Sequence, residues 1–105
     1  MEINDDNFEE KVIEQSKKKI VVVDFWASWC VPCNMLTPAL EKVIGNFEDK
    51  VELVKINVDE CPKTANKFAI NAIPAVKFFK NSNLVGEFIG VQPEDSIRKM
   101  IEKVL

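Results

Sequence analysis

The sequence predicts an α/β fold in which helices cover both faces of a central mixed β-sheet, and three observations indicate it. Residues 20–26 are apolar on both alternating faces except at Asp24, which is typical of a strand covered on both sides. Segments with helical periodicity alternate with strand-like segments along the chain. Residues 75–80 and 84–90 are rich in strand formers and flank Asn81-Ser82-Asn83, which favours an antiparallel hairpin.

The first elements follow from caps and spacing. Asn4-Asp5-Asp6 offers N-caps for a helix that ends near the lysines at 17–19. Its inward positions recur at helical spacing: Phe8, Val12 and Ile13. We expect Ile3 to add a short strand before this helix and residues 20–26 to form the central strand.

The next helix starts near Pro32, because proline suits the first turn of a helix, and it should bend at Pro38. Its predicted inward residues are Leu36, Leu40, Val43 and Phe47. Residues 51–58 are predicted to form a strand, and 62–68 a short helix. A last helix opens at Pro93-Glu94-Asp95 and presents one apolar face, made by Ile97, Met100, Ile101 and Val104.

Length and composition limit the possible functions. With 105 residues, 47% of them hydrophobic, residues 1–105 are predicted to form one domain. The net charge of −3 does not favour a nucleic-acid partner, and no apolar stretch indicates a membrane span or a signal peptide. The chain has no histidine, which excludes imidazole bases and histidine-containing zinc sites. Its three cysteines are too few for a secreted disulfide framework and favour a cytosolic redox site.

The stretch Trp29-Cys30-Val31-Pro32-Cys33 places two thiols three residues apart, directly after the central strand and at a helix start. The unpaired N–H groups of a first helical turn and the helix dipole favour a thiolate there. Cys33 lies about one turn beyond Cys30, so the two sulfurs can meet without much backbone movement. We therefore expect a dithiol that opens and closes reversibly.

Asp24 lies inside the strand that is apolar on both faces. A carboxyl group with little water favours its neutral form, so its pKa should rise. Such a group can accept a proton from a nearby thiol. A strand-end aspartate bonded to backbone amides is the alternative from the residues alone.

The element order, together with Asp24 to Cys33, Pro38, Ile73-Pro74 and Gly90, resembles the thioredoxin family over essentially the whole chain. The resemblance implies the thioredoxin fold and a protein disulfide oxidoreductase that acts as an electron carrier without a bound cofactor. It implies disulfide-containing client proteins, a separate reductase (a flavoprotein or a ferredoxin-linked enzyme), a monomer and a cytoplasmic location.

The resemblance also implies roles for single residues. Cys30 corresponds to the nucleophile, Cys33 to the resolving thiol, Asp24 to the proton acceptor, and Lys55 to the lysine beside it. Pro74 corresponds to a cis-proline that faces the dithiol. An apolar substrate-binding rim would consist of Trp29, Val31, Pro32, Ile73, Pro74, Gly90 and Val91.

Three other interpretations stay open. A disulfide oxidase or isomerase is disfavoured by the absence of a signal peptide and by proline rather than histidine before Cys33. A non-catalytic binding subunit with this fold would be compatible with an intact dithiol. A zinc site would need Cys30, Cys33 and Cys61 together with a carboxylate or water.

The chain departs from the commonest family pattern at Val31, where glycine is usual, and at Asn34, where a basic residue is frequent. Cys61 precedes Pro62 and is predicted to cap the short helix. It is either a buried apolar filler or, if exposed at that helix terminus, a regulatory thiol.

Overall fold

A computed structural model describes residues 3–105 of the chain, and its centre is a four-stranded mixed sheet with the order β2-β1-β3-β4. The strands are β1 (Ile20–Trp26), β2 (Val51–Asn57), β3 (Ala75–Lys80) and β4 (Asn83–Ile89). β1 pairs in parallel with β2 and antiparallel with β3, and β3 pairs antiparallel with β4. The predicted mixed sheet is confirmed.

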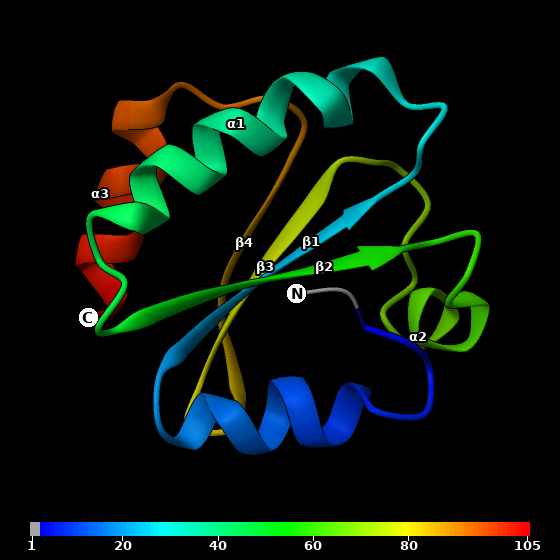
Figure 1. The fold of residues 1–105 in the computed structure, drawn as a ribbon, viewed down its shortest axis with the longest axis horizontal. Helices are drawn as coiled ribbons and strands as arrows, with labels where there is room; N and C mark the ends of the chain where they lie inside the picture. The colour runs from blue at the N-terminus through cyan, green and yellow to red at the C-terminus, as the bar shows by residue number, and fades with distance from the viewer. Residues whose placement is uncertain (1–2) are drawn as a thin grey trace.

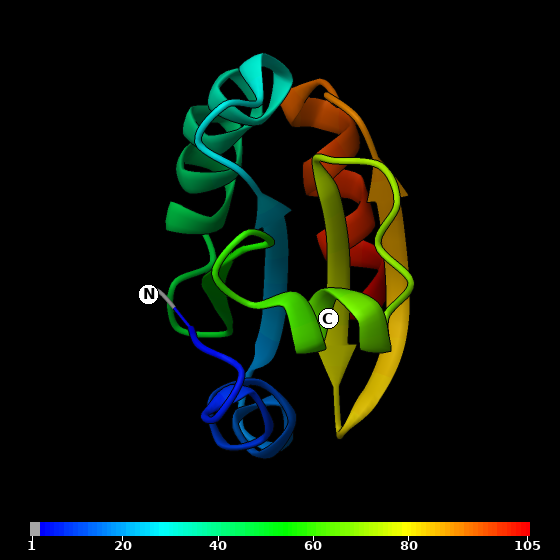
Figure 2. The ribbon, with the colours of Figure 1, turned by 90° about the vertical axis from the view of Figure 1, so that its right-hand side faces the viewer.

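Helices cover both faces of this sheet. α1 (Val31–Gly45) and α3 (Glu94–Val104) lie on one face, and the N-terminal helical segment and α2 (Pro62–Lys67) lie on the other (Figure 1). Figure 2 shows the same layers with α2 nearest the viewer. Because β1 is buried on both faces, its alternate side chains belong to two separate apolar clusters, with Val21, Val23 and Phe25 on one side and Ile20 and Val22 on the other.

The N-terminal segment differs from its prediction in two ways. Ile3 forms no strand; its N–H donates one hydrogen bond, of 3.3 Å, to the carbonyl of Lys55. The first helix consists of a π-helical stretch, η1 (Glu9–Glu14), and a 3-10 turn, η2 (Gln15–Lys17). A π-helix has about one more residue per turn than an α-helix, yet Val12 is still buried. The periodicity therefore predicted the buried face but not the type of helix.

Asp5 does not cap the first helix. Its carboxylate accepts hydrogen bonds from the Thr64 hydroxyl at 2.7 Å, from Thr64 N–H at 2.8 Å and from Lys63 N–H at 3.2 Å. These bonds, the one from the Thr64 hydroxyl above all, lower the pKa of Asp5. The side chain therefore caps α2 from a segment far away in sequence, which local cap patterns do not reveal.

Other boundaries move by a few residues. α1 continues through Pro38 but ends at Gly45, so Phe47 lies in the turn after the helix. Its side chain packs against the same apolar cluster as Leu36, Leu40 and Val43. The β3–β4 hairpin has a two-residue turn in which Asn81 and Ser82 both have positive φ angles, 52° and 69°. The Ser16 hydroxyl accepts a hydrogen bond of 2.9 Å from Ser82 N–H and ties this turn to η2.

Ala69 closes α2 in a left-handed conformation, with φ of 52°. Its N–H donates to Asn66, and Ile70 N–H donates to Ala65, which is the Schellman pattern normally completed by glycine. We expect Ala69→Gly to raise the free energy of unfolding by about 1 kcal/mol, because the Cβ clash of the left-handed region disappears. Denaturant melts measure this. As a matched control, Ala65→Gly inside α2 should lower the stability by about as much, and equal losses in both variants would contradict the assignment.

Candidate active site

The topology brings four chain segments to one edge of the sheet. The carboxyl ends of β1, β2 and β4 and the amino end of β3 lie there, because β3 alone runs antiparallel to β1. Residues 27–33 follow β1, residues 58–60 follow β2, residues 73–74 precede β3, and residues 90–91 follow β4. The sequence-predicted dithiol and rim residues thus meet at this edge, although they come from distant parts of the chain.

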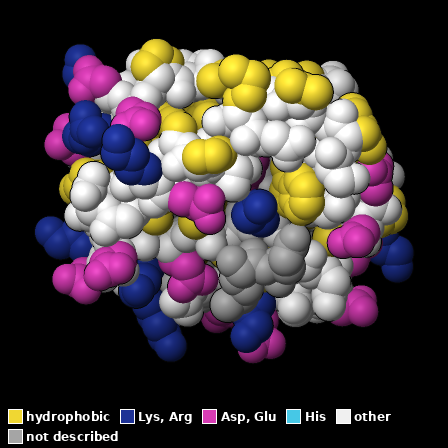
Figure 3. All heavy atoms as spheres, turned by 45° about the horizontal axis from the view of Figure 1, so that its top comes forward, with side chains coloured by type: hydrophobic (Ala, Val, Ile, Leu, Met, Phe, Trp, Pro, Cys, Tyr) yellow, Lys and Arg dark blue, Asp and Glu magenta, His cyan; other side chains and the backbone are white. Residues whose placement is uncertain are grey.

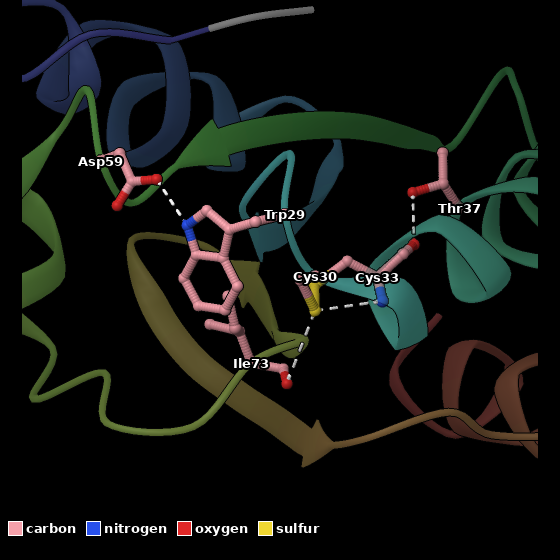
Figure 4. The surroundings of a disulfide bond; sticks show 6 residues. All are labelled: Trp29, Cys30, Cys33, Thr37, Asp59 and Ile73. Atoms are coloured by element: carbon pink, nitrogen blue, oxygen red, sulfur yellow. Dashed lines mark hydrogen bonds between the residues drawn. A yellow bond between two sulfur atoms is a disulfide. The ribbon is translucent and has the colours of Figure 1, made fainter.

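The dithiol lies at the start of α1, as predicted. Cys30 is the N-cap residue, Pro32 lies in the first turn, and the two cysteine sulfurs form a disulfide with Cα atoms 5.3 Å apart. The Cys33 N–H donates to Cys30 Sγ at 3.2 Å (Figure 4). An N–H donor and the helix dipole both stabilise negative charge on Cys30 Sγ once the disulfide is opened.

The two cysteines differ in their surroundings. Cys33 is fully buried, whereas Cys30 is 5% exposed and lies between Trp29 and Val31, whose exposed fractions are 66% and 68%. The Ile73 carbonyl oxygen is 3.9 Å from Cys30 Sγ (Figure 4). A partner approaching this edge therefore reaches Cys30 before Cys33.

The segments opposite Cys30 have the backbone that the family resemblance implied. The Ile73-Pro74 peptide bond is cis. Gly90 has a φ of +86° and donates its N–H to the Pro74 carbonyl at 2.8 Å, while a Cβ at Gly90 would meet no atom within 4 Å. Conformation, and not lack of space, is therefore what favours glycine there. Val91 beside it is exposed.

Trp29 is held in place by Asp59. The indole N–H donates to Asp59 Oδ2 at 2.8 Å, and Asp59 follows β2 (Figure 4). We expect Asp59→Ala to free the ring and to raise the KM for a protein disulfide by about threefold to tenfold, as for other residues that support an interface. Insulin reduction measures the KM, and tryptophan fluorescence reports the loosened ring. An unchanged spectrum together with an unchanged KM would contradict this positioning role.

Asp24 is completely buried and points toward the α1 side of the sheet. Neither of its carboxylate oxygens has a partner with full hydrogen-bond geometry among the described residues, since the nearby Thr37 hydroxyl donates to the Cys33 carbonyl instead. Burial raises its pKa to about 6, while the charge of Lys55 and the Thr37 hydroxyl lower it in part. The rise predicted from the sequence is thus confirmed, and the alternative of backbone-bonded oxygens is wrong.

Lys55 is the residue directly opposite Asp24 in the parallel β1–β2 register. Its Nζ lies 4.7 Å from the centre of the Trp26 ring. This cation–π contact holds the ammonium group on the same side of the sheet as Asp24. Lys55 is therefore placed to bias the charge of Asp24.

Cys61 lies apart from the dithiol. It precedes α2 as predicted, but its side chain is fully buried, with Sγ 3.0 Å from the Ile3 carbonyl oxygen. Burial favours the apolar-filler interpretation over a regulatory thiol. No group of three or more histidine, cysteine or acidic side chains within residues 3–105 is arranged to hold a metal ion, so the three cysteines do not converge as a zinc site would need.

Sequence reasoning missed two supporting residues. Thr37 donates its hydroxyl to the Cys33 carbonyl at 3.0 Å (Figure 4). It also lies near enough to Asp24 to lower its pKa, so it lies close to both Cys33 and the carboxyl group. The spacing of four residues between Cys33 and Thr37 on α1 is the sequence feature that could have predicted this contact. Asp59 gave no local signal, because its partner Trp29 is 30 residues away.

Comparisons with known proteins agree with this geometry. A thioredoxin family model matches residues 1–103. A thioredoxin of Staphylococcus haemolyticus is 39% identical over 105 residues, covering 100% of this chain and 97% of its own length. A thioredoxin of Buchnera aphidicola is 41% identical over 105 residues, covering 100% and 94%.

A chloroplastic M-type thioredoxin of Chlamydomonas reinhardtii is 39% identical over 103 residues, covering 98% of this chain and 72% of its own length. Across the described residues, no helix is both long and apolar enough to cross a membrane. Full-length similarity, together with a Cys30–Cys33 pair that forms a disulfide, makes the protein a thiol–disulfide oxidoreductase that acts as an electron carrier. The chain belongs to the thioredoxin family.

Proposed function

We propose that Cys30 is the attacking thiol and Cys33 the resolving thiol in the reduction of client disulfides. The observation that carries this assignment is the unequal placement of the sulfurs: Cys30 lies at the exposed rim with an N–H donor on its Sγ, and Cys33 is fully buried. In the first step the Cys30 thiolate attacks one client sulfur, and the other client sulfur leaves as a thiolate that takes up a proton.

In the second step Cys33 loses its proton to Asp24 and attacks Cys30 Sγ. The mixed disulfide breaks, the second client thiol leaves, and the Cys30–Cys33 disulfide forms, so that two electrons pass to the client. The raised pKa of Asp24, about 6, supports this role, because a base titrating near neutral pH can both accept and return a proton. Lys55 keeps that pKa from rising further.

The rim around Cys30 would bind the client. Exposed apolar side chains at Trp29, Val31 and Val91 supply contact area, and Pro32 exposes its ring next to them. Ile73 and Pro74 border the other side of Cys30, and Gly90 leaves open space beside them. A large and uncharged contact surface of this kind can bind many different client proteins.

The proposal also covers the domain organisation, oligomeric state, location and reductase of the protein. Residues 1–105 act as one domain and as a monomer in the cytoplasm, and a separate flavoprotein or ferredoxin-linked reductase regenerates the dithiol. The net charge of −3 supports a role without nucleic acid.

Equilibration against a dithiothreitol and glutathione ladder, with an insulin reduction assay beside it, tests this function. We expect a reducing potential and turnover of insulin. An oxidising potential would support a disulfide oxidase or isomerase instead. A folded protein without any redox response would support a non-catalytic binding subunit.

A further inference from the structure

An apolar line runs along the solvent face of α1 over its first two turns, beside the exposed side chain of Asn34. Val31 is 68% exposed, Met35 is 62% exposed, and Pro38 is also exposed. Spacings of four and three residues place them in one line, which we name the α1 stripe. The buried residues of α1 lie on the opposite side: Cys33, Leu36, Leu40, Val43 and Ile44. A surface helix usually has polar residues where this stripe lies.

The α1 stripe is continuous with the rim at the dithiol. Val31 belongs to both, and Lys42, on the same line one turn beyond Pro38, ends the stripe with an ion pair of 3.4 Å to Glu94. Figure 3 shows hydrophobic side chains gathered on the upper part of the face that carries α1. Within residues 3–105, three of the eight exposed large hydrophobic residues, Trp29, Val31 and Val91, are on the segments that meet at this edge. Two more continue these segments along the chain: Met35 on α1 and Ile89 at the end of β4. Single exposed apolar residues need no explanation, but a contiguous group indicates an interaction surface.

We propose that the α1 stripe is a second docking surface, which binds an apolar patch beside the disulfide of a folded client protein. The proposal rests on the proposed function, because it takes Cys30 as the point of attack. Figure 4 shows Ile73 and α1 on different sides of Cys30. An extended client segment lying along Ile73 therefore leaves the stripe uncovered.

A folded client reaches both sides of Cys30 at once. The stripe extends about 10 Å along α1, since a helix rises about 1.5 Å per residue. A protein surface of the usual interface size, roughly 800 Å² per partner, spans that distance easily. A small disulfide reagent does not, so the two kinds of substrate should respond differently to changes in the stripe.

The test compares Met35→Gln with two controls. Glutamine keeps the length and helix propensity of methionine but is polar. Met35→Leu keeps the apolar contact, and Leu84→Gln makes the same type of change at a residue that is 45% exposed on β4, near the hairpin turn. With insulin, dithiothreitol recycles the dithiol while kcat and KM are measured. With 5,5′-dithiobis(2-nitrobenzoate), which dithiothreitol would reduce directly, the rate is measured in a single turnover of the pre-reduced protein without added thiol.

We expect Met35→Gln to raise the KM for insulin about fivefold, in the range seen for contributing interface residues, with kcat and the rate of the small disulfide unchanged. Met35→Leu and Leu84→Gln should behave like the wild type. Equal loss with both substrates, or no loss with either, would overturn the proposal. So would sedimentation showing a wild-type dimer that Met35→Gln dissociates, because the stripe would then bind a second copy. A wild type that reduces neither substrate would refute the proposed function itself.

Discussion

Cys30→Ser should abolish disulfide reduction, whereas Cys33→Ser should still attack a client and then stay covalently bound to it. Cys30 Sγ lies at the rim, where the Cys33 N–H stabilises its thiolate. Cys33 is fully buried, so it can reach Cys30 Sγ but not a client sulfur. Without a resolving thiol, the mixed disulfide has no intramolecular route to release. Loss of the nucleophile should lower the rate by a factor of about 10³ or more.

Mass spectrometry of each variant after incubation with insulin measures the trapped product. The mixed disulfide should appear with Cys33→Ser only. A double variant, Cys30→Ser with Cys33→Ser, serves as the matched control, since it retains buried Cys61 and reports any background from that thiol. Equal trapping by Cys30→Ser would show that the roles of the two cysteines are reversed.

Local patterns in the sequence predicted most of the fold and the centre of the site. β1 could be predicted because burial on both faces requires apolar residues at successive positions, and Asp24 is the one charged residue in this run. The helix start at the dithiol could be predicted because Pro32 and the two cysteines lie within one turn. The cis state of Pro74 required the family resemblance, since an isoleucine–proline bond is more often trans.

The features that the sequence did not predict depend on contacts between distant segments. Asp5 caps α2 and not the first helix, because the fold brings Thr64 beside it, 59 residues away. Trp29 and Asp59 meet only once β1 and β2 end at the same edge of the sheet. The N-terminal segment showed the right buried residues, but burial periodicity alone cannot separate a short π-helical stretch from an α-helix.

The free energy of unfolding of Asp24→Asn, compared with that of the wild type, should increase as pH rises. The pKa of Asp24 is raised in the folded state to about 6, from an unfolded value near 3.8. Between these values the unfolded chain releases its proton while the native protein retains it, so wild-type stability falls as pH rises. Two pKa units correspond to about 3 kcal/mol. The loss begins near the unfolded pKa of 3.8, where half of the unfolded carboxyl groups are already ionised, and it is nearly complete above about pH 7.

Denaturant melts of the oxidised proteins at pH 4 and pH 8 measure this difference. The new amide adds unpaired donors in a buried site, which costs about 1–3 kcal/mol, but that cost does not change with pH. The gap between the variant and the wild type should therefore shift by roughly 2–3 kcal/mol in favour of the variant between the two pH values, whatever its size at pH 4. The same substitution should slow release of the client by about tenfold or more, because asparagine cannot accept the Cys33 proton. A stability gap independent of pH would mean that the carboxylate is well solvated or paired, and that Asp24 is not the base of the resolving step.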